Sequence, residues 1–350
     1  MVAMRSAPLM GSKIPYLEGW PGKNRPGTSA GPRRIEPGQE YVLMSAASDH
    51  TSPVGSPIVW VANQPYLLLC ITALCWAGNA IVGRLAAGHI PPVTLSFLRW
   101  SLAFLVILPL SFKHLKHDWP AIRGKLGVMV LMSVTGIGVF NTLQYWALEH
   151  TQALNTLLLQ SSGPLIVAVW SLILLGVRLT PAQAIGVMLS LCGVLVILTQ
   201  GDLSALSAIR FNRGDLIFLV AMITFGFYSV LTLKRPAIHS LSLAGFTFGC
   251  GAVALIPLLL WELKARPAMV IDTQNVLSLI YVAIFPSTVA YLCFNRGVQL
   301  VGANRAAPFL HIVPVFGAAM AMVFLGERPQ LFHVVGFVMV LTGVYIASRK

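Results

Sequence analysis

The chain has 350 residues, of which 56% are hydrophobic and only 10% are charged. An ordinary soluble domain carries about 25% charged residues, so this composition excludes a water-soluble globular protein and predicts an integral membrane protein. The net charge of +13 is scattered over short polar connections instead of forming one basic face with interleaved aromatic residues, which argues against nucleic acid as a partner.

The N-terminal segment differs in composition from the rest of the chain. Residues 1–62 are rich in proline, glycine and serine and contain no long apolar run, which predicts a disordered tail. Met44 offers an alternative start, so residues 1–43 need not belong to the native protein.

From Pro65 onward, apolar runs of roughly twenty residues recur, the length that crosses a hydrocarbon core of about 30 Å as a helix. Backbone hydrogen bonds cannot be left open in lipid, so runs of this length predict helices and not strands. The predicted fold is therefore an all-α integral membrane protein with ten transmembrane helices. They are expected at residues 65–87, 92–112, 124–147, 152–175, 181–199, 215–234, 241–261, 275–296, 302–325 and 330–348.

The basic residues predict how these helices are oriented, because cytoplasmic loops retain Lys and Arg. With the N-terminus inside, most of the basic residues fall in the tail and the inner connections. The outer side holds only Arg84, Arg210, Arg213, Lys264, Arg266 and Arg328. We expect a multi-pass protein of the cell (inner) membrane, with both termini in the cytoplasm.

An internal repeat appears when the chain is shifted by 150 residues, which lays the fourth and fifth spans on the ninth and tenth. The residues in register include Pro164 with Pro314, Gly176 with Gly326, Gly186 with Gly336, and Gly193 with Gly343. Glycine and proline set backbone geometry and close helix approach, so their coincidence indicates two related halves. Each half has five helices, an odd number, so the second is expected to be inverted relative to the first. The predicted repeats cover residues 65–199 and 215–348, joined by a linker at 200–214.

Several stretches of this pattern also carry a resemblance. They are Trp76-Ala77-Gly78-Asn79 with Arg84, Arg99, Tyr145-Trp146-Ala147-Leu148, Thr151-Gln152-Ala153, Pro164, and the pairs Gly176/Gly326 and Gly193/Gly343. Over about residues 66–348 the chain resembles the EamA family of the drug/metabolite transporter superfamily. The resemblance implies a central cavity lined by both halves, and transport, often export, of amino acids or other small metabolites. The chain departs from the family where Val177 follows Gly176, because members often carry Glu there, as Glu327 follows Gly326.

Polar side chains are costly at membrane depth, so those that occur are candidates for a substrate-binding site. Arg99 lies about one third of the way into the second span without an acid in helical reach. It is either a structural anchor or a contact for an anionic group of the substrate. Other candidates share helical faces: Trp76 with Asn79, Asn141 with Tyr145, and Tyr291 with Asn295, together with Tyr228, which answers Asn79 in the second half. For each of these, hydrogen bonding between helices is the alternative.

Two prolines are predicted to kink their helices, because a proline frees the carbonyl four residues before it. Pro164 frees the carbonyl of Gln160, and Pro314 lies three residues after His311. We include Gln160 and His311 in the predicted substrate-binding set. His311 is the histidine placed deepest in a predicted span, where it could titrate near neutral pH or remain neutral and hydrogen-bonded.

These features favour a carrier of a small-molecule solute over an enzyme. An intramembrane enzyme would need a nucleophile with a base, an HExxH motif or paired carboxylates, and the sequence contains none of them. An enzyme without a metal, a channel and a structural membrane protein are the alternatives, although a channel would require a ring of like side chains. The five cysteines form no CxxC pattern, so neither a metal nor a cofactor is expected. The sequence is compatible with a homodimer.

Overall fold

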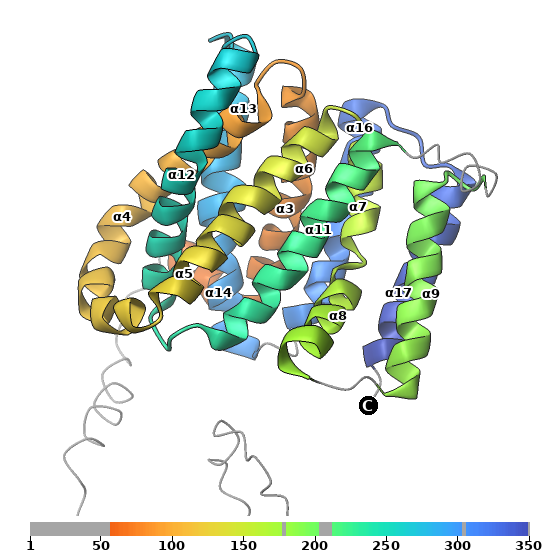
Figure 1. Cartoon of the computed structure of the whole chain (residues 1–350), viewed down its shortest axis with the longest axis horizontal. Coiled ribbons are helices and arrows are strands. Elements are labelled where there is room, and N and C mark those ends of the chain that lie inside the picture. The colour runs from red at the N-terminus through yellow and green to blue at the C-terminus, as the bar shows by residue number, and fades with distance from the viewer. Residues whose placement is uncertain (1–56, 177–179, 203–211, 303–305, 349–350) are drawn as a thin grey trace, which may run out of the picture. The chain divides into compact units, whose positions relative to one another are not determined.

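The computed structural model describes residues 57–176, 180–202, 212–302 and 306–348, and these residues form helices and no strand (Figure 1). The predicted all-helical fold is confirmed for this part of the chain. Residues 1–56 of the predicted tail lie outside it, as do residues 203–211 of the predicted linker. The predicted tail ends earlier than expected, since the apolar residues Pro57–Ala62 form a short helix, α2, ahead of the first span.

The first half of the described chain extends to residue 202, and the second half begins at residue 212. After α2, the first half contains α3 (Pro65–Ala86), α4 (Pro92–Gly124), α5 (Leu126–Met132), η1 (Ser133–Val139), α6 (Phe140–Leu148), α7 (Ala153–Gln160), α8 (Gly163–Leu175) and α9 (Pro181–Leu198). The second half contains α11 (Arg213–Leu231), η2 (Thr232–Lys234), α12 (Ser240–Ala265), α13 (Thr273–Ala283), η3 (Ile284–Val289), α14 (Ala290–Val301), η4 (Ala307–His311), α16 (Ile312–Leu325) and α17 (Leu331–Ser348).

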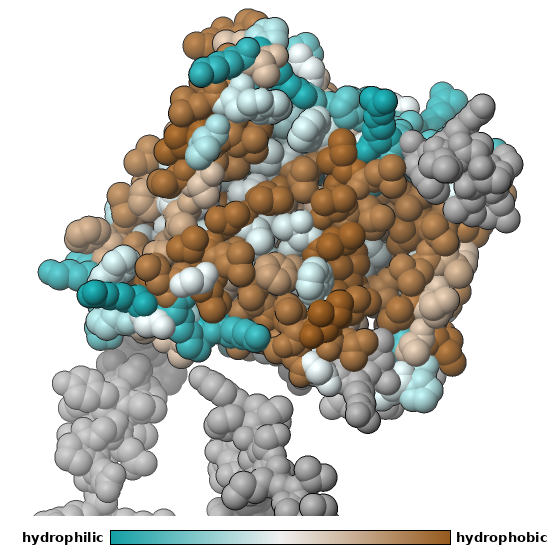
Figure 2. Space-filling view, viewed as in Figure 1, coloured by the Kyte–Doolittle hydropathy of each residue, from teal (hydrophilic) through white to brown (hydrophobic). Residues whose placement is uncertain are grey.

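Within the described residues, seven helices are long and apolar enough to cross a membrane, and the bent pair α7 and α8 raises this to eight. Residues Phe309–Leu325 and Leu331–Ile346 form shorter apolar helices. Figure 2 shows one face, on which hydrophobic residues cover the middle of the helices and hydrophilic residues gather toward their ends. This distribution is that of a multi-pass membrane protein, in which lipid surrounds the apolar middle.

The third and eighth predicted spans are interrupted at equivalent positions by π-helical segments, η1 and η3. In the repeat of 150 residues, Gly136 of η1 and Pro286 of η3 occupy equivalent positions. A π-helical turn leaves carbonyls unpaired within the helix, and such turns occur frequently at functional sites. Pro286 has no N–H group to donate to the carbonyl of Val282, and the hydroxyl of Ser287 donates to that carbonyl instead, at 2.8 Å.

Contacts between the halves follow one symmetric pattern. Helix α3 packs on α14 and α16, and its counterpart α11 packs on α6 and α8, which correspond to α14 and α16 in the other half. Helices α4 and α12 pack on each other, as do α9 and α17, which lie side by side in Figure 1. Exchanging the two halves therefore reproduces each of these pairings.

Matched glycines bring α9 and α17 together. A Cβ atom on Gly193 would lie 2.7 Å from the carbonyl oxygen of Gly336, and a Cβ on Gly343 would collide with the carbonyl oxygen of Gly186. Gly186 therefore lies near Gly343 and Gly193 near Gly336, so the two helices run antiparallel. The hydroxyl of Ser190 donates to the carbonyl of Val340 at 3.2 Å between these two points.

Candidate functional site

A buried arginine gathers polar side chains from two other helices and a π-helical segment. Arg99 of α4 is only 3% exposed. Its Nε donates to the hydroxyl of Ser287 at 2.7 Å. Its Nη1 donates to Oδ1 of Asn79 at 3.0 Å, to Oδ1 of Asn141 at 2.9 Å and to the hydroxyl of Tyr145 at 2.6 Å. We call these five residues the Arg99 cluster.

The Arg99 cluster joins the two halves, because Ser287 belongs to η3 of the second half and the other members belong to the first. Local bonds fix which atoms face the guanidinium. The Asn141 amide nitrogen donates to the carbonyl of Gly136 at 3.1 Å, so its oxygen is directed to Arg99. The Tyr145 hydroxyl also donates to Oδ1 of Asn79 at 2.8 Å. The π-helical segments thus help to position the cluster.

Arg99 is surrounded by neutral oxygen atoms. No carboxylate in the described ranges lies within ion-pair distance of its guanidinium, and its Nη2 has no hydrogen-bond partner among those residues. The guanidinium carbon lies 4.4 Å from the ring centroid of Trp100, which gives a cation–π contact. The net positive charge of the cluster is therefore dispersed but not neutralised.

The corresponding positions of the second half hold uncharged residues. When the sequences of α4 and α12 are aligned at Pro109 and Pro257, Thr247 takes the position of Arg99. The hydroxyl of Thr247 donates to the carbonyl of Leu243 in its own helix. Tyr228, Tyr291 and Asn295 correspond to Asn79, Asn141 and Tyr145.

These counterparts do not enter the Arg99 cluster. The hydroxyl of Tyr291 donates to the carbonyl of Ser240 at 2.8 Å, and Nδ2 of Asn295 donates to the carbonyl of Tyr291 at 2.7 Å. The Tyr228 ring lies against Gly136, where an added Cβ would come within 2.6 Å of its Cε2. The structure therefore brings four of the predicted substrate-binding residues together and leaves these three outside.

Trp76 lies beside the cluster, whereas Gln160 and His311 stand at helix breaks. The indole nitrogen of Trp76 donates to the carbonyl of Pro286 at 3.1 Å, next to Ser287 in the chain. Gln160 ends α7 and His311 ends η4, and both side chains are half-buried. Neither side chain forms a hydrogen bond to another described residue.

The two prolines lie just after these breaks. Pro164 is the second residue of α8, which is bent by 46° relative to α7. Pro314 is the third residue of α16, which follows the 3₁₀-helical η4. Both helices end at a glycine with positive φ, 66° at Gly176 and 64° at Gly326. The breaks, the prolines and the terminal glycines thus recur in both halves.

A second buried polar group was not predicted from the sequence. Asp215 is 0% exposed and accepts hydrogen bonds from the hydroxyl of Thr151 at 2.5 Å and from Nδ2 of Asn155 at 3.1 Å. The Asn155 oxygen lies 2.8 Å from Nε2 of His333, which is 3% exposed. His311 is therefore not the most deeply buried histidine. His333 lies near the start of its helix, and its burial by α7 could not be read from hydropathy.

Carboxylates near the helix ends connect the halves. Glu262 of α12 accepts from the backbone nitrogens of Val93 and Thr94 at the start of α4, at 3.0 and 2.7 Å. In the opposite sense, Asp118 of α4 accepts from the backbone nitrogen of His239 at the start of α12, at 2.9 Å. A negative charge at a helix N-terminus pairs with open N–H groups and with the helix dipole. Because each carboxylate lies near the end of one helix and the start of the other, α4 and α12 run antiparallel.

Glu327 makes a similar connection, since its carboxylate accepts from the backbone nitrogens of Ala153 and Leu154 at the start of α7. Val177, where the chain departs from the family pattern, lies outside the described residues.

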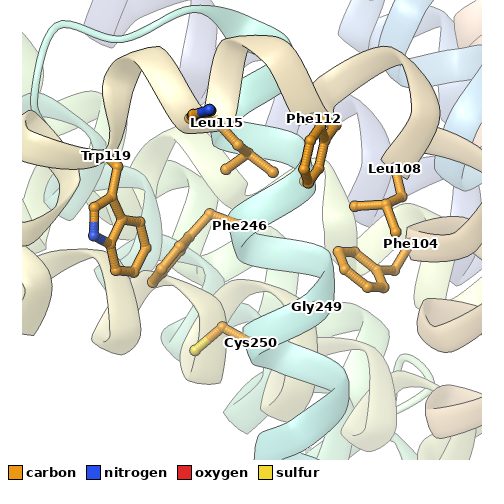
Figure 3. Close-up of a pocket in the computed structure, with 10 residues that line it drawn as sticks. Phe104, Leu108, Phe112, Leu115, Trp119, Phe246, Gly249 and Cys250 are labelled. Atoms are coloured by element: carbon orange, nitrogen blue, oxygen red, sulfur yellow. The ribbon is translucent and has the colours of Figure 1, made fainter.

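A groove of about 490 Å³ lies between α4 and α12 (Figure 3), and no residue of the Arg99 cluster lines it. It is lined by Phe104, Leu108, Phe112, Leu115, Lys116, Trp119, Gly245, Phe246, Gly249 and Cys250. Phe112 and Trp119 are 62% and 49% exposed, so the groove opens on the surface of the protein. Its lining offers almost no polar group and does not suit a polar solute.

Comparison with known proteins gives a consistent result. The sequence pattern of the EamA-like transporter family matches residues 63–199 and 212–349. An uncharacterised transporter of Archaeoglobus fulgidus is 28% identical over 289 residues, which cover 82% of this chain and 98% of that protein. A probable terminal-alkyne amino-acid exporter of Streptantibioticus cattleyicolor is 26% identical over 288 residues, covering 81% and 92%. Among the solved structures that resemble this fold, a crystal structure has a TM-score of 0.55 at 19% identity, and the match covers 81% of this chain and 96% of that chain.

Proposed function

Because the chain belongs to the EamA-like transporter family, which matches both of its halves, we propose that it carries a small metabolite across the cell membrane by alternating access. The cargo is an amino acid or a related compound, and the direction is export. The relative that is named a probable amino-acid exporter supports both points.

The proposed architecture is ten spans in two inverted halves, with both termini in the cytoplasm. The seven long apolar helices, the bent α7 and α8 pair and the two shorter apolar helices would together make ten. The antiparallel pairing of α9 with α17, which are counterparts in the repeat, supports the inversion. Inverted repeats are the architecture of carriers that bind their solute near the membrane midplane.

The observation that carries the proposal is the Arg99 cluster at the junction of the halves. A guanidinium is costly within a membrane, and such residues generally mark a solute or ion pathway. Here the bond from Arg99 to Ser287 crosses from one half to the other. A movement that parts the halves would break this bond and open the cluster to a solute.

In the proposed mechanism the two halves exchange geometries, so that the site opens first to one side and then to the other. The matching contacts of α3 and α11 support this exchange, because each half packs in a way that the other half can adopt. The solute shifts the equilibrium only by its different affinity for the two states.

Counterflow of labelled metabolites in proteoliposomes tests this function. The wild-type protein is expected to exchange at least one metabolite from a cell extract, and Arg99→Gln should abolish that exchange. Lys116→Gln is the matched control, because it removes a positive charge from the same helix outside the Arg99 cluster. Equal exchange by Arg99→Gln and the wild type would reject the site.

A further inference from the structure

The chemistry of the Arg99 cluster narrows the class of cargo, an inference that rests on the proposed function. The cluster contains one positive charge, two amides and two hydroxyl groups. The Arg99 guanidinium is buried and bonds only to neutral oxygen atoms, so its positive charge is not compensated. A buried guanidinium is most stable beside an anion. The cluster is therefore suited to a negatively charged group.

Unpaired hydrogen-bond donors next to Arg99 also favour a negatively charged ligand. Ser96 and Trp100 lie three residues before and one residue after Arg99 on α4, and they are 0% and 4% exposed. The hydroxyl of Ser96 and the indole nitrogen of Trp100 are buried and have no hydrogen-bond partner. Nη2 of Arg99 also has none among the described residues. Buried donors without acceptors are rare, and two of them, Ser96 Oγ and Trp100 Nε1, lie within five residues of α4 on either side of Arg99.

The N–H and O–H groups near Arg99 require hydrogen-bond acceptors as partners. A carboxylate offers acceptor oxygens and no donor. In this structure the cluster is closed, since Arg99, Ser96 and Trp100 are all nearly inaccessible. The same movement that parts the halves would allow an acceptor-rich group to reach them.

The second half offers no partner for an ammonium group, which narrows the proposed cargo from amino acids to related compounds. The counterparts of the first-half members are uncharged, and no carboxylate in the described part of the chain bonds to Arg99; these counterparts are Thr247, Tyr228, Tyr291 and Asn295. Rings line the second half's side of the site, because Phe248 lies 4.8 Å from Trp100 and 5.8 Å from Tyr291 between centroids. An ammonium here would be desolvated beside the positive charge of Arg99, which is strongly unfavourable.

We infer that the cargo is an organic anion. Its carboxylate, or a similar acidic group, binds Arg99 with Ser96 and Trp100, and its uncharged, partly apolar body faces the aromatic side. The cargo thus resembles an amino acid that lacks its ammonium group.

Four probes that share one body test this inference on the purified full-length protein. They are 3-phenylpropanoate, phenylalanine, 3-phenylpropylamine and 3-phenylpropanamide, which are an anion, a zwitterion, a cation and a neutral amide. Binding is measured by protection against thermal unfolding in nanodiscs. We expect 3-phenylpropanoate to bind at least about tenfold more tightly than the other three, because only it adds a compensating charge without a second uncompensated one.

Variants separate recognition from folding. Arg99→Gln should weaken 3-phenylpropanoate binding by at least about tenfold, and Ser96→Ala and Trp100→Phe by about three- to tenfold each. The control Lys116→Gln should leave binding unchanged. If the Ser96 and Trp100 donors are merely unpaired core groups, their removal would stabilise the unliganded protein and leave anion binding intact, which would overturn the inference.

The outcomes also distinguish this inference from the proposed function. Tighter binding of phenylalanine, the amine or the amide would overturn the organic-anion inference and leave a carrier of another cargo. If Arg99→Gln abolishes metabolite counterflow but 3-phenylpropanoate does not bind the wild type, the organic-anion inference is also overturned and the carrier function stands. Absence of any counterflow by folded protein would reject the carrier itself.

Discussion

At the scale of single residues, Tyr145 holds the Arg99 cluster together. Its hydroxyl accepts a hydrogen bond from Arg99 and donates one to Asn79. We predict that Tyr145→Phe lowers the free energy of unfolding by about 1–3 kcal/mol, because buried partners lose their bonds. Unfolding of the detergent-purified protein in SDS measures this change. Tyr66→Phe is the control, since Tyr66 is 53% exposed, and an equal loss in the control would contradict the prediction.

Part of this cluster could be predicted from the sequence. The cost of polar groups in lipid singles out Arg99, and helical spacing places Asn141 and Tyr145 on one face. Ser287 could not be predicted, because a serine in an apolar helix usually bonds to its own backbone, as Ser287 also does with Val282. Its bond to Arg99 depends on how the two halves pack, and neither spacing nor hydropathy encodes that arrangement.

At the scale of helices, the contact between α9 and α17 depends on glycine. A methyl group at Gly343 would collide with the carbonyl of Gly186, whereas one at Gly127 of α5 would meet nothing within 4 Å. We predict that Gly343→Ala destabilises the protein by about 1–3 kcal/mol through overpacking. Gly127→Ala should instead be neutral or stabilising by up to about 1 kcal/mol, because alanine favours a helix. Thermal unfolding of the two variants tests the difference, and a stable Gly343→Ala protein would place the helices farther apart.

The carboxylate of Glu262 provides a second prediction at this scale. It accepts from the backbone nitrogen and the hydroxyl of Thr94. In a double-mutant cycle, Glu262→Gln and Thr94→Ala should couple by about 0.5–3 kcal/mol, since they remove the same interaction. Glu262→Gln combined with Tyr66→Phe serves as the uncoupled pair. Additive losses for Glu262 and Thr94 would show that the carboxylate does not stabilise the start of α4.

The helices themselves were predictable to different degrees. Hydropathy located each apolar segment, but it ended the second span at residue 112, whereas α4 continues to Gly124. The polar residues after position 112 end the apolar run without ending the helix. The π-helical segment η1 contains no proline and had no signal in the sequence, whereas Pro286 of η3 lacks an N–H group and could have indicated a break in the eighth span.

At the scale of the whole described chain, the arrangement of α4 and α12 makes the inverted repeat testable. Glu262, near the end of α12, lies at the start of α4, and Asp118, near the end of α4, lies at the start of α12. The two helices are counterparts, so a parallel repeat would place their C-terminal ends on the same side. Their antiparallel contact predicts that these ends lie on opposite sides of the membrane, in agreement with five spans per half.

Cysteine labelling checks this prediction directly. In a variant without the five native cysteines, one cysteine is placed at Gly124 or at Ala265, the exposed last residues of α4 and α12. A membrane-impermeant maleimide should label Ala265→Cys in intact cells and Gly124→Cys only in inside-out vesicles, because Lys and Arg concentrate at the cytoplasmic end of α4. Labelling of both positions from one side would mean that the halves are not inverted. The exchange of geometries between two equivalent arrangements would then have no structural basis, and the Arg99 cluster would be a fixed anchor instead of a site that opens in turn to each compartment.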